Sequence, residues 1–219
     1  MAAETITVYI DPEQLAQQKN NNYSLYLAKM VNGQFTVIWQ ALGSSSYLYL
    51  NTFEVGAPSY QVNYGTVTQG GGGSSFAAAG LSQAIEIGQS VTLDQNGLFE
   101  APTGGMSGEI TIFNQLQGNP NAALLDNAGN LVFVNTQSGM DIGEMTLSPT
   151  DTYQLWFGNE QQAGTIIAFN VGNAGSVSFG GGQTNQVISY NAQGQWQDGP
   201  LAQGLATEQA TAQDQAPLG

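Results

Sequence analysis

Apolar and polar residues alternate in short runs along most of the chain. A period of two is what a β-strand with one buried face requires. The runs are separated by turns rich in Gly and Asn, and the clearest turn is Asn32-Gly33, between alternating runs at 23–30 and 34–40. Asn-Gly between two such runs predicts a tight hairpin. Short strands joined by frequent turns predict an all-β fold.

The strand pattern is repeated within the chain. An aromatic and aliphatic run that ends on glycine occurs at 60–65 and again at 153–158. Three flanking segments recur in the same order: 6–9 as 110–113, 33–38 as 129–134, and 91–99 as 188–196. A spacing of about a hundred residues is a whole small β domain rather than a solenoid repeat.

The repeat predicts an internal duplication into two tandem domains, each a β-sandwich or Greek-key-like fold. The first domain is expected at 1–104 and the second at 105–200, because 101–105 is the best candidate boundary. Residues 201–219, rich in Ala, Gln and Gly, are expected to be a C-terminal tail docked on the body. A single closed barrel is the alternative architecture.

The net charge of the chain restricts the molecules that it can bind. The 219 residues carry 16 acidic side chains and two basic ones, Lys19 and Lys29, for a net charge of −14. Binding of nucleic acid or of anionic lipid requires clustered Lys and Arg, so neither nucleic acid nor a membrane is an expected partner. The expected state is a monomer or a weak homo-oligomer.

Cysteine and histidine are absent, as is arginine. Disulfides are excluded, zinc, copper and iron sites lose their usual ligands, and catalysis by a Cys nucleophile or a Ser-His-Asp triad is excluded. We therefore expect a protein that is not an enzyme. The N-terminal residues lack the features of a signal peptide, and no apolar run is long enough to cross a membrane, which predicts a cytoplasmic location.

Aromatic side chains are the richest remaining source of binding chemistry, with nine Tyr, nine Phe and three Trp. Core packing explains many such rings in β proteins. The alternative is a pocket that holds a flat ligand. The candidate ligand-binding residues are Trp156 and Trp196 for stacking, Tyr153 and Tyr190 as polar groups, and Trp39. Trp156 and Trp196 are singled out because they replace Asn63 and Phe99 of the first copy.

The densest group of acidic residues comprises Asp141, Glu144 and Asp151. A solvated acidic surface that keeps the protein soluble is one interpretation. A site for a hard cation, Ca²⁺ or Mg²⁺, is the other, since these ions prefer carboxylate and carbonyl oxygens.

An acidic chain of 23.0 kDa without Cys or His, duplicated internally and containing tryptophan, is similar to the pink chromoprotein family of oyster-type mushrooms. The segment 23–33 also looks like strands of small fungal β proteins. This resemblance implies a non-enzymatic carrier of a small organic chromophore of indole type, with a divalent ion as a further component.

Three hypotheses follow. The first is a non-enzymatic protein that binds a conjugated or aromatic small molecule, a pigment, in an aromatic-lined pocket. The second is a cytoplasmic fungal-type lectin or defence protein with one carbohydrate site in each repeat, and amide side chains that bind sugar hydroxyls. The third is a storage or structural protein without a ligand, in which the aromatic rings are core.

Overall fold

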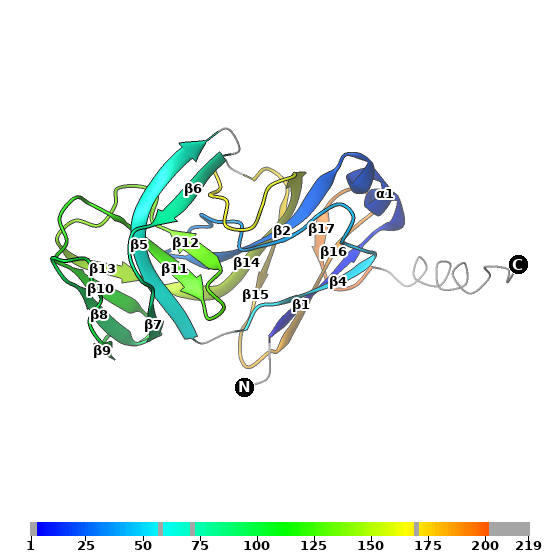
Figure 1. The fold of residues 1–219 in the computed structure, drawn as a ribbon. Coiled ribbons are helices and arrows are strands. Elements are labelled where there is room, and N and C mark those ends of the chain that lie inside the picture. The colour runs from blue at the N-terminus through cyan, green and yellow to red at the C-terminus, as the bar shows by residue number, and fades with distance from the viewer. Residues whose placement is uncertain (1–3, 57–58, 71–72, 169–170, 202–219) are drawn as a thin grey trace, which may run out of the picture.

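A computed structural model describes residues 4–56, 59–70, 73–168 and 171–201. Strands account for 53% of the structure and a single helix for 5% of it, in the part of the chain that is described, which confirms the all-β prediction. The strands form four sheets, and the sheets are arranged as two lobes (Figure 1).

The first lobe, called the terminal lobe, contains the strands nearest the two chain ends. Its members are β1 (Thr5–Ile10), β2 (Tyr23–Val31), β3 (Gln40–Leu42), β4 (Leu50–Glu54), β14 (Pro149–Asn159), β15 (Ala174–Ser178), β16 (Asn185–Tyr190) and β17 (Trp196–Asp198), with the helix α1 (Pro12–Asn20). One sheet has the order β17-β16-β1-β4 and the other β15-β14-β2-β3. The sheets pack face to face, and Phe157 of β14 stacks on Trp196 of β17 with ring centroids 5.8 Å apart.

The second lobe, called the inserted lobe, is built from the continuous middle of the chain. Its members are β5 (Ser59–Gly70), β6 (Gly73–Ala78), β7 (Gln83–Glu86), β8 (Gln89–Leu93), β9 (Thr103–Gly104), β10 (Ile110–Asn114), β11 (Asn121–Asp126), β12 (Leu131–Val134) and β13 (Gly143–Leu147). Its sheets have the orders β13-β10-β8-β9 and β12-β11-β5-β6, with β7 also paired to β5. Tyr64 of β5 meets Phe99, which follows β8, edge to face.

The sheet pairings do not follow the predicted division into two tandem domains at residue 104. Every sheet contains strands from both sides of that position, and β9 and β10, which flank it, lie in one sheet. The repeated pattern marks equivalent strands, but strand pairing depends on which edges meet in space. The boundaries between the lobes are instead the β4–β5 and β13–β14 connections (Figure 1).

The two lobes nevertheless correspond strand for strand. The order β17-β16-β1-β4 matches β9-β8-β10-β13, and β15-β14-β2-β3 matches β6-β5-β11-β12. In both lobes one strand pair is parallel: β1 with β16, and β10 with β8. The terminal lobe therefore combines β1–β4 of the first repeat with β14–β17 of the second. The inserted lobe combines β5–β9 of the first repeat with β10–β13 of the second.

The hairpin turn after β2 confirms the Asn-Gly prediction. Asn32 and Gly33 have φ of 52° and 72°, and the backbones of Val31 and Gln34 exchange both hydrogen bonds. Positive φ at both central residues is the geometry that Asn-Gly favours. The expected strand at 34–40 forms only at its end, where β3 begins at Gln40.

Helix α1 begins where the sequence offers a cap. The carboxylate of Asp11 accepts hydrogen bonds from the backbone N–H groups of Glu13 and Gln14, and Pro12 occupies the first turn. An Asp cap followed by proline is a common helix start. The helix covers one end of the terminal lobe (Figure 1).

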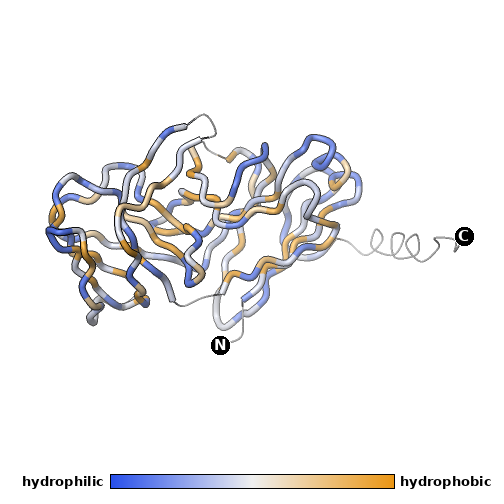
Figure 2. Tube along the Cα trace, viewed as in Figure 1, coloured by the Kyte–Doolittle hydropathy of each residue, from blue (hydrophilic) through white to orange (hydrophobic). Residues whose placement is uncertain are grey.

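The core runs through both lobes, and apolar positions concentrate on the inner strands (Figure 2). A separate cluster, formed by Val37, Ala123, Val134 and Ile166, fills the junction between the lobes. The backbone of Ile166 bonds the carbonyl of Ser74 in the inserted lobe, while Ile167 bonds the carbonyl of Thr36 in the terminal lobe. The lobes are thus joined by packing and by backbone hydrogen bonds.

The expected docked tail, 201–219, lies outside the described residues except for Leu201, which is buried. Among the residues that the structure describes, no helix has the length and apolar character needed to cross a membrane.

Candidate functional site

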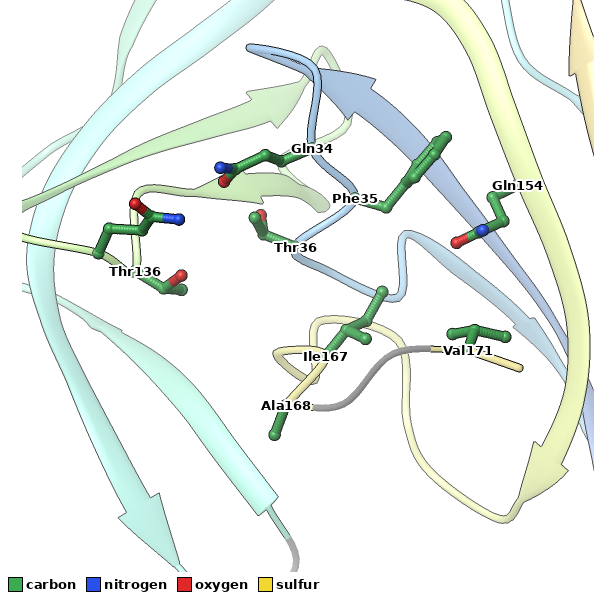
Figure 3. Close-up of a pocket in the computed structure, with 9 residues that line it drawn as sticks. Gln34, Phe35, Thr36, Thr136, Gln154, Ile167, Ala168 and Val171 are labelled. Atoms are coloured by element: carbon green, nitrogen blue, oxygen red, sulfur yellow. The ribbon is translucent and has the colours of Figure 1, made fainter. Parts of the chain in front are cut away.

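A large cleft lies between the two lobes (Figure 3). Its volume is about 850 Å³, within the range of sites that bind small molecules. The lining residues come from four separate segments: Gln34, Phe35 and Thr36 after β2, Thr136 and Gln137 after β12, Gln154 of β14, and Ile167, Ala168 and Val171 between β14 and β15. We call this the interlobe cleft.

Strand period and turn geometry place these side chains. Gln154 lies between Tyr153 and Leu155, both fully buried, so the alternation of β14 directs its amide away from the core and toward the cleft (Figure 3). The residues that follow the turn at Asn32-Gly33 lie on the side of the terminal lobe that faces the inserted lobe. There the hydroxyl of Thr36 accepts a 3.1 Å hydrogen bond from the N–H of Val134 in the inserted lobe.

The chemistry of the interlobe cleft is neutral and polar with one aromatic face. Its nine lining residues include no acidic or basic side chain. The side-chain amides of Gln34, Gln137 and Gln154 make no hydrogen bond to another residue that the structure describes. Each amide offers both a donor and an acceptor. The half-buried ring of Phe35 stands opposite Ile167 and Val171 (Figure 3). The cleft therefore suits an uncharged ligand with many hydroxyl groups and an apolar face.

The aromatic residues predicted to bind ligand are distributed over three places. Trp156 is buried against Tyr26, with ring centroids 5.4 Å apart. Its ring also lines a small pocket of about 190 Å³. Tyr26 is fixed there because its hydroxyl donates a 2.5 Å hydrogen bond to the carbonyl of Asn159.

Tyr190 and Trp196 belong to a second group, between the two sheets of the terminal lobe. Their ring centroids are 4.9 Å apart, and both pack on Phe157. The hydroxyl of Tyr190 accepts a hydrogen bond from the amide of Asn173. The backbone of Gly175 approaches the indole of Trp196 so closely that a Cβ there would lie 2.8 Å from Cδ2. These rings pack as part of the core.

Trp39 and Tyr153 form the third group, at the junction of the lobes. Their rings are stacked with centroids 6.1 Å apart. The indole N–H of Trp39 donates a 2.9 Å hydrogen bond to the carboxylate of Asp126 in the inserted lobe. Trp39 also borders a separate hollow of about 580 Å³ together with Glu54. The structure thus brings Trp39 and Tyr153 together but places none of the five predicted residues on the interlobe cleft.

A buried lysine lies beside this third group. The side chain of Lys29 on β2 is 3% exposed, and its Nζ donates to the hydroxyl of Tyr153 at 2.7 Å and to Oδ1 of Asp151 at 3.1 Å. Burial lowers the pKa of Lys29, against the opposing effect of Asp151. Burial raises the pKa of Tyr153, and the charge of Asp151 adds to that increase.

The three carboxylates predicted to hold a cation are not gathered into one group. Asp151 pairs with Lys29, whereas Asp141 and Glu144 are exposed in and before β13. Among the described residues, no cluster of three or more acidic side chains is placed to hold a metal ion. The hard-cation site stays a prediction without a structural candidate.

Sequence reasoning missed the residues of the interlobe cleft. Phe35 carried a usable signal because it follows the hairpin turn, and Gln154 because it lies within the repeated phrase between two core residues. Gln137 and Thr136 carried none, since they reach the cleft only through the pairing of β12 with β11.

Comparison of the chain with protein-family models, with curated proteins and with solved structures found no match. The class of this protein is therefore assigned from the structure itself. It is an all-β protein of two lobes, each of which contains strands from both halves of the chain.

Proposed function

We propose that the protein is a non-enzymatic binding module and that the interlobe cleft holds a neutral carbohydrate. The single observation that carries this proposal is the lining of that cleft: the amides of Gln34, Gln137 and Gln154, which make no hydrogen bond to a described residue, lie beside the ring of Phe35, and the described lining carries no charge. Amide groups pair with sugar hydroxyls in both directions, and an aromatic ring accommodates the apolar face of a sugar. The absence of arginine and histidine disfavours anionic sugars.

Binding of a conjugated pigment is the second candidate. The pocket between Tyr26 and Trp156 supports it, because this hollow has two aromatic walls. Its volume of about 190 Å³ is smaller than the range of roughly 300 Å³ and above that holds most organic ligands. The pigment hypothesis therefore has weaker support than carbohydrate binding. The pocket likewise gives little support to the resemblance to the pink chromoprotein family, which suggested a pigment.

We also propose that the two halves descend from a duplication whose copies exchanged their closing strands. The matched sheet orders of the two lobes support this. In the repeat, Phe35 corresponds to Leu131 and Gln154 to Gln61. Gln61 already donates to the carbonyl of Asn127, and Leu131 lines a smaller, more apolar pocket of about 320 Å³. A single sugar site in the chain is therefore favoured over one sugar site in each half.

Isothermal titration calorimetry against a panel of neutral mono- and oligosaccharides, chosen from a glycan array, tests the proposal. We expect one site per chain, with affinity lost in Phe35→Ala and reduced at least tenfold in Gln154→Ala, about 1.4 kcal/mol. Phe113→Ala is the matched control, since it removes an exposed ring from β10, outside the cleft.

The two candidate functions give different results. Absorption above the tryptophan band, with excess mass in the native protein that Trp156→Ala removes, supports the pigment. A colourless protein that binds no neutral sugar on the array contradicts both proposals. Binding that survives Phe35→Ala unchanged places the sugar elsewhere and overturns the assignment to the interlobe cleft.

A further inference from the structure

Lys29 and Asp151 join the two central strands of one sheet at a point where the hydrogen-bonding ladder is irregular. β2 and β14 pair antiparallel, and their register shifts between Pro149 and Tyr153, the interval that contains Asp151. The carboxylate of Asp151 reaches Nζ of Lys29 across this shift, at 3.1 Å from Oδ1. Lys29 is one of two cationic side chains in the chain and is 3% exposed. Such burial is costly unless the amine has a specific role or complete pairing.

The surroundings hold the amine in one position. Its Nζ lies 4.5 Å from the centroid of the Tyr153 ring and donates to the hydroxyl of that ring. The hydroxyl in turn donates to the carbonyl of Val55 at 3.1 Å. This chain of contacts fixes Nζ against the carboxyl group of Asp151 with little freedom to move.

The backbone of Glu4 is joined to the same network. The backbone carbonyl of Glu4 accepts a hydrogen bond from the N–H of Val55, which places Glu4 directly before β1 and beside the Tyr153 contact. Burial raises the pKa of Glu4, and the charge of Asp151 adds to that increase, while the charge of Lys29 opposes it. Glu4 therefore favours the protonated form more than an ordinary glutamate, and burial favours the neutral amine of Lys29.

From this geometry we infer that Lys29 and Asp151 become linked by an intramolecular isopeptide bond between Nζ and Cγ, which joins β2 to β14 covalently. Glu4 is the group that moves protons during the reaction. A cross-link of this kind gives a cysteine-free chain the covalent connection between strands that disulfides supply elsewhere. This inference does not depend on the proposed sugar site.

The reaction balances without an external reagent. A proton passes from Nζ of Lys29 to the Asp151 carboxylate along their hydrogen bond, and the resulting amine attacks Cγ, so that a C–N bond forms. The carboxyl group of Glu4 donates its proton to the departing hydroxyl and takes one from the nitrogen, so that one C–O bond breaks and water leaves. Neither oxidation nor reduction occurs, and Glu4 ends in its starting state. Asp151 is 59% exposed on its outer side, which gives the water a path to solvent.

The chain is well suited to a decisive test because trypsin cleaves only after Lys and Arg, and Lys19 and Lys29 are its only such residues. Denatured unlinked protein yields three fragments: 1–19, 20–29 and 30–219. Linked protein yields two, because trypsin does not cleave at an acylated lysine, and cleavage after Lys19 is the internal control. We expect two fragments from the full-length wild-type chain and an intact mass lower than that of the sequence by one water.

Variants test the roles of Asp151 and Glu4. Asp151→Ala and Glu4→Gln are each expected to release the 20–29 peptide and to restore the lost mass of water, while Glu100→Gln, an acidic position in the inserted lobe, keeps the link. Retention of the link in Glu4→Gln overturns the role of Glu4. Release of 20–29 from the wild-type protein, with the mass of the unlinked chain, overturns the isopeptide bond and leaves an ordinary buried ion pair.

Discussion

The indole N–H of Trp39 donates a 2.9 Å hydrogen bond to Oδ2 of Asp126, and this contact ties the terminal lobe to a turn of the inserted lobe. The same carboxylate organises its own turn. Oδ1 accepts from the N–H groups of Ala128 and Asn130, and Oδ2 also accepts from the amide of Asn130. One buried carboxylate thus orders a β-turn and the contact between the lobes together.

Replacement of Trp39 by Phe is expected to destabilise the protein by about 3 kcal/mol, because it removes a charged hydrogen bond as well as part of a buried ring. Urea unfolding followed by tyrosine fluorescence or circular dichroism measures the change. Trp156→Phe is the matched control. Its indole is equally buried but makes no hydrogen bond to a described residue, so it is expected to lose less. Equal losses in both variants contradict a specific role for the contact with Asp126.

Gly175 marks a close approach between the two sheets of the terminal lobe. A Cβ there would lie 2.6 Å from Cδ1 of Ile188 and 2.8 Å from Cδ2 of Trp196. We expect Gly175→Ala to cost about 1–3 kcal/mol through overpacking. Gly172→Ala provides the comparison, because its added methyl group meets no described residue within 4 Å. If Gly175→Ala unfolds at the same urea concentration as the wild-type protein, Trp196 is loosely packed and regains interest as a ligand contact.

Alkaline pH is expected to weaken the fold. Burial raises the pKa of Tyr47 from 10.0 to about 12, and it raises the pKa of Tyr60 and Tyr153 as well. The folded state therefore retains phenolic protons that the unfolded chain releases near pH 10, so stability is complete below that pH and declines as the pH rises toward the folded-state values. Urea midpoints measured between pH 8 and pH 12 check this. Tyr47→Phe is expected to show a shallower decline, and an identical one excludes a contribution from Tyr47.

Local features of the fold could be predicted because each depends on neighbouring residues. The turn at Asn32-Gly33 requires positive φ, and the alternation around Gln154 separates buried from cleft-facing positions. The repeated phrases identify strands that occupy matching places in the two lobes. Period and turn chemistry are local properties, so the sequence alone was sufficient for them.

Long-range pairing could not be predicted in this way. β1 pairs with β16, whose partner residues lie 180 positions away at Thr5 and Asn185, and no local pattern encodes that choice. The candidate site was missed for the same reason: Phe35 and Gln137 meet only after the lobes assemble. For the aromatic residues, core packing and a ligand pocket were the two interpretations, and the structure packs Tyr190 and Trp156 into core clusters. Large rings stabilise β cores by burial wherever sheets face one another.

The interlocked connectivity predicts how pieces of the chain behave. The half 1–104 contains no complete sheet. Four of its strands, β1, β2, β5 and β8, each pair with a strand beyond residue 104. The fragment 59–147 is shorter but contains both sheets of the inserted lobe. We expect 59–147 to give a β-sheet circular dichroism spectrum and cooperative unfolding. We expect 1–104 alone to give neither and to refold only when mixed with 105–219, as a one-to-one complex on size exclusion. Cooperative unfolding of isolated 1–104 would instead support two independent tandem domains.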